Sequence, residues 1–213
     1  MSYTEGVTAP DDPRTSLRAS LRAEQVEQTR AALVAAGRVL FGRAGFAATS
    51  VEDLAREARV TTGALYHHFP GKAALFEAVF EQVHLELLQA VASDGLTLGT
   101  ADWFGAGAGA FLDKVLEPDV QQIVITDAPA VLGLARFTEL DERYAYTGLA
   151  DGLRAAAAAG APAVDDPETM ARLLLGTLTR AGMLIASSAD PRTTRDAVAA
   201  SLRTLTAGFA APS

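Results

Sequence analysis

The chain has 213 residues, of which 49% are hydrophobic and 21% charged, and its formal net charge is −8. This composition is typical of a soluble globular protein, and no uncharged run reaches the roughly 18 apolar residues that a membrane-spanning helix needs. The sequence contains no cysteine, which excludes disulfides and thiol catalysis and indicates a cytoplasmic location.

The N-terminus, MSYTEGVTAPDDPRTS, contains proline and aspartate where a secretory signal would have a basic start and an apolar run. We expect residues 1–22 to form a disordered arm, followed by a small domain over 23–71 and a larger one over 72–213. Residues 14–75 contain nine Lys or Arg against five Asp or Glu, whereas residues 76–213 contain nine against eighteen. The first third could therefore face a polyanion, although charge also varies by chance along any chain.

Apolar residues recur at spacings of three and four along most of the chain, which predicts an all-α fold. The first helix is expected over 26–44. Within it Leu33, Leu40 and Phe41 lie on one stripe, and Gly45 follows as a stop signal.

Two shorter helices are expected next, separated by the three-residue turn RVT. Ser50 and Asp53 have the spacing of a reciprocal capping pair at the start of a helix over 51–58. The segment TGALYHH then forms a helix over 62–68. A bracing helix followed by two short helices and a tight turn is the arrangement of a helix-turn-helix unit.

The third helix is short and polar, which suits insertion into a major groove. Seven residues span roughly 10 Å. The small first turn, TGA, lets the backbone approach a ligand closely, and its free N–H groups favour phosphate. Taken singly, Tyr66 could be a packed surface aromatic, Thr61 an ordinary N-cap and Lys72 a solvated charge, but their order together favours DNA binding.

The stretch TSVEDLAREARVTTGALYHHFPGKAALFEAV resembles the DNA-binding signature of the tetracycline-repressor (TetR) family, over roughly residues 26–80. The matching features are a threonine before the second helix, the LAREA segment, a threonine-rich start of the recognition helix, a tyrosine followed by histidine and phenylalanine, and a lysine after the turn. The resemblance implies DNA contacts from Thr49, Thr62, Gly63, Ala64, Tyr66, His67 and Lys72, and we also expect DNA contacts from Ser50, Arg59 and Thr61.

Arg59 departs from the family pattern, which usually has glycine after the second helix. A left-handed backbone at this arginine would cost about 1–2 kcal/mol. Either the turn relaxes, or a phosphate contact of Arg59 compensates.

Beyond residue 80 the resemblance implies only a helical layout. Periodicity predicts a linking helix over 72–92, and then a helix in ADWFGAGAGAFLDKVLE that ends before Pro118. The segment QQIVITDAPAVLGLARF continues the helical body, and another long helix ends at Gly160.

The middle of the chain combines large aromatic side chains with glycines, which predicts a cavity for a small, mostly hydrophobic molecule. Six of the fourteen aromatic residues lie between residues 103 and 146. These rings could equally fill a core, and the histidine on the linking helix could sense a ligand, be satisfied in the core or lie exposed. The residues predicted for the ligand site are His84, Trp103, Phe104, Gly107, Phe111, Asp127, Phe137 and Tyr144.

The last two helices, over about 166–187 and 192–210, have more apolar surface than one body needs. Burial within the single chain could account for it, but the family resemblance implies that this pair forms a four-helix bundle with the same pair of a second copy. The residues predicted for this homodimer interface are Leu174, Leu178, Ile185, Val198, Leu202 and Leu205.

An enzyme is not expected. The chain has three histidines and no cysteine, and no carboxylate and histidine cluster has metal-ligand spacing, so we expect neither a metal nor a cofactor. The sequence predicts a ligand-responsive regulator, most often a repressor, that binds a palindromic double-stranded DNA operator as a homodimer, is released by a small-molecule effector and does not involve a membrane. The alternative is a helical protein-interaction adaptor without sequence-specific DNA binding.

Overall fold

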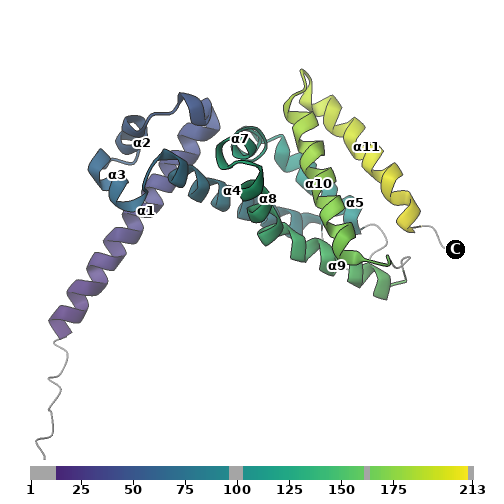
Figure 1. The fold of residues 1–213 in the computed structure, drawn as a ribbon, viewed down its shortest axis with the longest axis horizontal. Helices are drawn as coiled ribbons and strands as arrows, with labels where there is room; N and C mark the ends of the chain where they lie inside the picture. The colour runs from purple at the N-terminus through teal and green to yellow at the C-terminus, as the bar shows by residue number, and fades with distance from the viewer. Residues whose placement is uncertain (1–12, 96–102, 161–163, 211–213) are drawn as a thin grey trace, which may run out of the picture.

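The computed structural model describes residues 13–95, 103–160 and 164–210, and every regular element in these ranges is helical (Figure 1). The predicted all-α fold is therefore confirmed. In chain order the helices are α1 Pro13–Ala48, α2 Val51–Glu57, α3 Thr62–His68, α4 Lys72–Gly95, α5 Trp103–Val115, α6 Pro118–Val120, the π-helix η1 Gln121–Asp127, α7 Ala128–Leu132, α8 Leu134–Asp141, the π-helix η2 Glu142–Tyr146, α9 Thr147–Ala158, α10 Pro167–Ala186 and α11 Pro191–Ala210.

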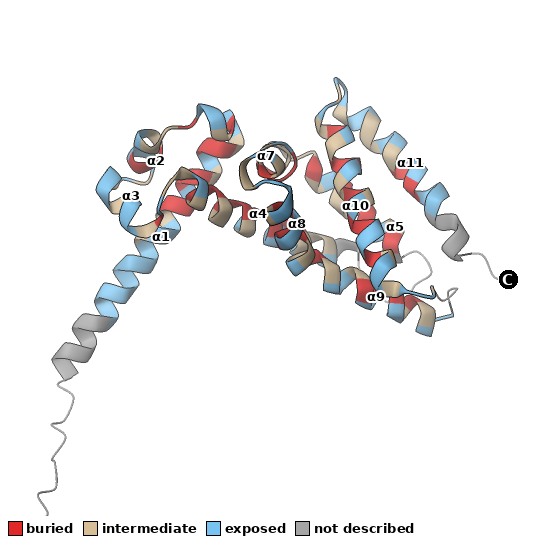
Figure 2. Ribbon diagram, in the orientation of Figure 1, coloured by how far each residue is buried: buried red, intermediate tan, exposed pale blue. Residues whose placement is uncertain are grey.

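The first helix is longer than predicted at its N-terminal end. Residues 13–22, which the sequence placed in a disordered arm, are helical, and residues 1–12 lie outside the described part of the chain. The stretch LRASLRAEQ consists largely of strong helix formers, which favours the helical conformation of this segment. Residues 20–28 are exposed, and α1 projects away from the body of the molecule (Figure 2).

The C-terminal end of α1 follows the prediction. Gly45 has φ 79° and ψ 165°, which interrupts the helix at the stop predicted from the sequence. Leu33 and Phe41 are fully buried against the linking helix α4. A Cβ atom at Gly37 would lie 2.7 Å from Cγ2 of Val79, so glycine permits the close packing of α1 and α4.

Helix α4 connects the two bodies of the molecule. Its first half, including Leu75, Phe76 and Val79, is buried with α1 in the N-terminal body, and its second half, including Val83 and Leu87, is buried in the C-terminal body (Figure 2). One continuous helix therefore carries residues of both cores, which makes α4 a rigid connection between them.

The C-terminal body packs α5 along α4 and places α10 and α11 on its outer side (Figure 1). The segment predicted as a continuing helical body, QQIVITDAPAVLGLARF, is divided into η1, α7 and α8, and Gly133 with φ 75° separates α7 from α8. The expected long helix up to Gly160 contains η2 and α9. Periodicity did not distinguish these π-helical turns from α-helix, because both present apolar residues every three to five positions.

Part of α1, Ser20–Ala48, is long and apolar enough by length and composition to cross a membrane. Its apolar residues have another explanation in this fold. Leu33, Val34, Leu40 and Phe41 are all buried in the N-terminal core, and Arg38 on the same stretch forms ion pairs with the C-terminal body.

Candidate functional site

The recognition helix α3 is held in place by its N-cap and by buried residues on its inner face. The hydroxyl of Thr61 accepts a hydrogen bond from the backbone N–H of Ala64, at 3.1 Å, which caps the N-terminus. Leu65 is fully buried and Phe69 nearly so, and the guanidinium of Arg30 lies 5.0 Å from the Phe69 ring centroid. These contacts hold the opposite face of α3 toward solvent.

The exposed face of α3 and the turn before it contain most of the predicted DNA contacts. The exposed residues among them are Arg59, Thr61, Thr62, Gly63, Tyr66 and His67, and Ala64 is half-buried. Tyr66 is 56% exposed, although it is one of the large hydrophobic side chains of the domain. An exposed aromatic beside a threonine-rich helix start and an arginine presents aromatic, hydroxyl and cationic groups on one surface.

Three of the residues predicted to contact DNA also have a structural role. Thr49 is only 4% exposed, and its hydroxyl donates to the carbonyl oxygen of Gly45 at 2.8 Å. Ser50 is the N-cap of α2 and forms the predicted capping box with Asp53. The Lys72 ammonium donates to two backbone carbonyl oxygens at the end of α1. The phosphate contacts of Thr49 and Lys72 stay predictions, and both side chains have hydrogen-bond partners at the end of α1.

Arg59 adopts the left-handed backbone that the sequence made possible. Its φ is 57°, the only positive φ at a non-glycine residue in the described ranges. The turn has therefore not relaxed, and the strain of about 1–2 kcal/mol is retained. The side chain is exposed beside α3.

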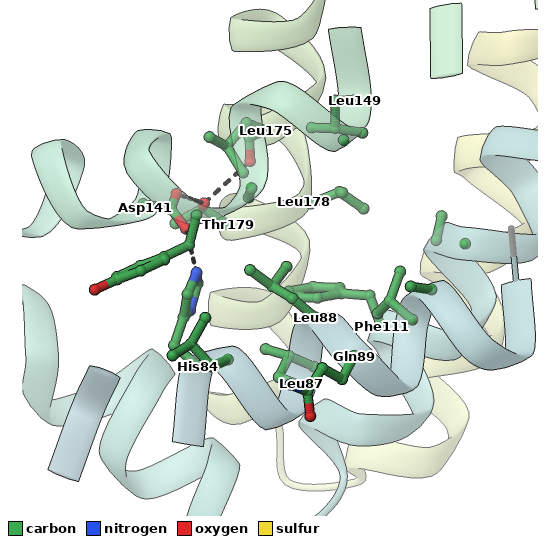
Figure 3. A pocket seen from close by; sticks show the side chains of 18 of the residues that line it. His84, Leu87, Leu88, Gln89, Phe111, Asp141, Leu149, Leu175, Leu178 and Thr179 are labelled. Carbon is green, nitrogen blue, oxygen red and sulfur yellow. Dashed lines mark hydrogen bonds and ion pairs between the residues drawn. The ribbon is translucent and has the colours of Figure 1, made fainter. Parts of the chain in front are cut away.

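The C-terminal body encloses a cavity of about 330 Å³ between α4, α5, η2, α9 and α10 (Figure 3). Most of its lining is aliphatic or aromatic. Leu87 and Leu88 come from α4, Phe111 from α5 and Leu178 from α10. A space of this size lined mainly by apolar side chains is typical of a binding site for a small organic molecule.

The polar groups of the cavity gather at one end, where His84 of α4 faces Asp141 at the end of α8 (Figure 3). Nε2 of His84 lies 3.5 Å from Oδ1 of Asp141, and the Thr179 hydroxyl donates to Oδ2 at 3.4 Å. Burial lowers the pKa of His84 to about 4. Burial raises the pKa of Asp141 to about 6, and the hydrogen bond from Thr179 opposes part of that rise.

Five of the eight predicted ligand residues line this cavity: His84, Phe104, Gly107, Phe111 and Tyr144. Asp127 and Phe137 do not. Asp127 accepts a hydrogen bond from the backbone N–H of Phe46 at 2.7 Å, and Phe137 packs against Phe80 in the core. The side chain of Trp103 lies outside the described residues.

The cavity residues that sequence reasoning missed include the polar residues Asp141 and Thr179, the leucines of α10, the small residues of η2 and α9, and the α4 residues other than His84. Asp141 is the last residue of α8, in a run rich in Glu and Arg, so its sequence context indicates an exposed helix end. The helical period contained a signal. Leu140 and Asp141 follow Phe137 by three and four residues, so the three side chains share one face of α8, and all three are buried. A charged residue on the buried side of an amphipathic helix is a candidate functional group.

Contacts between α1 and the C-terminal body link the two halves of the chain. Arg38 donates to Asp119 at 2.9 Å and to Glu86 at 2.5 Å, so one α1 side chain joins α6 and α4. The Phe46 N–H, freed by the break at Gly45, is bound by Asp127 of η1. The position of α1 is therefore coupled to the elements beside the cavity.

Helices α10 and α11 leave a shallow, mostly apolar groove on the outer surface. Leu173, Leu184 and Leu205 line it and are 61%, 44% and 67% exposed. Of the predicted interface residues, Val198, Leu202 and Leu205 line this groove. Leu174, Leu178 and Ile185 are buried within the single chain. This placement differs from the prediction because both faces of α10 are apolar, so the sequence period does not say which face is covered.

The described residues contain no group of three or more His, Asp or Glu side chains that could hold a metal ion.

Two family models match the chain, one in each half. Residues 33–79 match the model described as bacterial regulatory proteins, tetR family, and residues 101–209 match a tetracyclin repressor-like C-terminal domain. The second match alone covers about half of the sequence.

Relatives and solved structures give the same result. A TetR-family transcriptional regulator from Pectobacterium atrosepticum is 34% identical with a TM-score of 0.79, over 87% of this chain and 96% of that one. The transposon Tn10 TetC protein of Escherichia coli is 28% identical over 123 residues, so the match spans 57% of this chain and 61% of that relative. RolR, in a structure with the ligand resorcinol, has the same fold at 20% identity and a TM-score of 0.62, over 90% of this chain and 97% of that one.

Proposed function

Because this chain belongs to the TetR family of transcriptional regulators, which are not enzymes, we propose that it is a repressor that binds a palindromic operator as a homodimer and is released by a small, mostly hydrophobic effector. The observation that carries the proposal is the position of α4, which contributes to the core beneath the recognition helix and to the wall of the apolar cavity.

DNA binding is assigned to the exposed face of α3 and the turn before it. The small residues Thr62 and Gly63 lie against base edges, and Arg59, Tyr66 and His67 reach the flanking backbone. Thr49, Ser50 and Lys72 position these groups by closing the ends of α1 and α2, and the third N–H of the Lys72 ammonium reaches a phosphate. The net negative charge of the second half keeps that half away from the duplex.

Dimerisation is assigned to the groove between α10 and α11. Leu173 and Leu205 are exposed there in a single chain, and Gly176 leaves open space for a helix to approach. The same pair of helices in a second copy covers these residues by two-fold symmetry, which gives a four-helix bundle. The two recognition helices then read half-sites about 34 Å apart, or a multiple of that spacing, on one face of the duplex.

Release requires the effector to prefer one spacing of the recognition helices, since a molecule with equal affinity for both states shifts nothing. An effector in the cavity contacts the second half of α4. A small change in the tilt of that helix moves α1 and α3 through the buried contacts at Phe76 and Val79 and through the Arg38 ion pairs. The protein acts in the cytoplasm, where it meets both DNA and small metabolites.

Selection from a random duplex pool, followed by gel shift, tests the proposal. We expect enrichment of an inverted repeat, a complex with two chains per duplex, and a binding constant that falls steeply with salt. A salt-independent shift or no shift at all would instead favour the helical adaptor. A screen for compounds that release the selected duplex then tests the effector assignment separately.

A further inference from the structure

His84 is the buried polar side chain that this fold leaves without a hydrogen bond. It is 3% exposed, and neither ring nitrogen bonds to any described residue. Its ring stacks on Phe80, with centroids 5.2 Å apart, which fixes its direction toward the cavity. Buried polar atoms are nearly always paired, so an unpaired imidazole in a native core requires an explanation.

The group that faces His84 is also incompletely satisfied. Asp141 is 8% exposed, and Thr179 gives its carboxylate one long hydrogen bond while the same hydroxyl also bonds to the Leu175 carbonyl oxygen at 3.0 Å. Figure 3 shows His84, Asp141 and Thr179 together at one side of the cavity, with Leu88 and Leu178 beyond them. The remaining lining offers two further polar side chains, Gln89 and Tyr144.

The charge states follow from burial. At neutral pH the Asp141 carboxyl, with a pKa of about 6, is ionised, and the His84 ring, with a pKa of about 4, is neutral. A bare nitrogen lone pair 3.5 Å from a carboxylate oxygen would be repelled, so the proton of the neutral ring sits on Nε2. The cavity therefore presents one hydrogen-bond donor and one acceptor side by side.

We propose that the effector is an uncharged, largely hydrophobic molecule with a hydroxyl group that accepts a hydrogen bond from His84 Nε2–H and donates one to the Asp141 carboxylate; this rests on the proposed effector role of the cavity. A hydroxyl both accepts and donates, and its oxygen can lie within hydrogen-bond distance of two groups that are 3.5 Å apart. An anion is repelled by Asp141. An ammonium group can pair with Asp141 but has no lone pair to accept the N–H of His84, and a plain hydrocarbon forms no hydrogen bond with either group.

Two matched pairs of probes test this inference by calorimetry on the full chain: 2-naphthol against naphthalene, and 4-phenylphenol against biphenyl. In each pair the hydrophobic surface is nearly the same, so the hydroxyl accounts for the difference. We expect each hydroxyl compound to bind roughly ten- to a hundredfold more tightly than its parent, as for a hydrogen bond to a charged group. The cation 2-naphthylmethylamine should bind more weakly than 2-naphthol.

The double variant His84→Phe with Asp141→Leu should remove this preference, so that the affinity ratio within each pair falls to about one. It should also melt at the same or a higher temperature than the unaltered protein, because two unsatisfied groups leave the core. Leu149→Ala is the control: Leu149 lines the cavity without a polar group, so both members of a pair should lose affinity while their ratio stays high.

Equal affinities within each pair, no binding by either hydroxyl compound, or an unchanged ratio in the double variant would overturn the inference. If the proposed effector role of the cavity is wrong, a different variant shows it. If Gly148→Leu, which introduces a side chain at the cavity wall where a Cβ meets no atom within 4 Å, leaves the affinity of every probe unchanged, the cavity itself is not the binding site.

Discussion

The Lys72 ammonium lies 4.1 Å from the ring centroid of Phe46 and donates a hydrogen bond to the Phe46 carbonyl oxygen at 2.8 Å. A second bond, to the Thr49 carbonyl oxygen, has a length of 2.9 Å. The first residue of α4 therefore closes the end of α1, where carbonyl groups have no helical partner and the helix dipole favours a cation.

Replacing Lys72 with Met should lower the free energy of unfolding by about 1–3 kcal/mol, because two charge-assisted hydrogen bonds are lost while the aliphatic packing is kept. Urea denaturation measures this effect, with Lys72→Arg as the control that retains the charge. DNA affinity should fall as well. If stability is unchanged and only the salt dependence of DNA binding decreases, by about one unit of slope, Lys72 acts mainly on phosphate.

Arg59 provides a test in which stability and DNA binding move in opposite directions. Arg59→Gly should raise the free energy of unfolding by about 1 kcal/mol, since glycine tolerates the positive φ. The same change should weaken operator binding and reduce the salt slope by roughly one, since a phosphate contact is lost. Arg59→Lys keeps both charge and strain and should change neither quantity much. Unaltered affinity in the glycine variant would remove Arg59 from the DNA interface.

The groove between α10 and α11 can be tested without disturbing the core. Leu205→Glu places a charge on a side chain that is 67% exposed in a single chain, so the fold should tolerate it while the dimer should not. Sedimentation velocity should show monomers, with a melting temperature that no longer depends on protein concentration. Leu134→Glu is the matched control, because Leu134 is 78% exposed and lies outside the groove. A dimeric Leu205→Glu protein would place the interface elsewhere.

Filling the cavity should separate induction from DNA binding. Gly107 is buried on α5 and lines the cavity, so Gly107→Leu should abolish release by effector and leave operator affinity unchanged. Gly148→Leu is a second variant with open space around its Cβ, which guards against misfolding of the first. Competition between effector and duplex in fluorescence anisotropy measures the effect. Normal release in both variants would contradict the assignment.

The buried pair His84 and Asp141 should make stability unusually flat between about pH 4 and pH 6. The raised pKa of Asp141, from 3.8 to about 6, means that its ionisation lowers stability as pH rises through this window. The lowered pKa of His84, from 6.5 to about 4, means that its protonation lowers stability as pH falls. The two effects oppose each other.

Asp141→Asn removes only the first effect, so stability of this variant should increase as pH rises from about 4 to 6.5. At pH 7 the free energy of unfolding of the variant should exceed that of the unaltered protein by up to about 3 kcal/mol, which corresponds to the rise of this pKa from 3.8 to about 6. Urea unfolding at several pH values measures the difference. A variant with the same pH profile as the parent would show that the pKa of Asp141 is not raised in the native state.

Local sequence patterns were sufficient to predict most of the helix ends in the N-terminal domain. The capping box at Ser50, the stop at Gly45 and the bounds of α3 are set by interactions between residues a few positions apart, and all three agree with the structure. The left-handed turn at Arg59, one of two alternatives that the sequence left open, is local in the same sense. These features need no knowledge of distant contacts, because helix ends are decided by which nearby groups satisfy the terminal N–H and C=O groups.

Two of the site predictions depended on the direction of a side chain, which local patterns do not determine. Lys72 points inward because the end of α1, folded beside it, offers unpaired carbonyl groups. Asp127 binds Phe46 instead of lining the cavity, because the break at Gly45 leaves a free N–H within its reach. In both cases the partner lies more than twenty residues away in sequence, so no helical period could identify it.

The sequence by itself determined the fold class, the family and the position of the recognition helix, since each depends on periodicity and on short motifs. Only the tertiary structure decided which face of α10 is covered and that His84 of α4 meets Asp141 of α8. The physical reason is that both faces of α10 are apolar and both polar residues lie on amphipathic helices. Burial of one face, and the partner that a buried charge finds there, depend on how the helices pack.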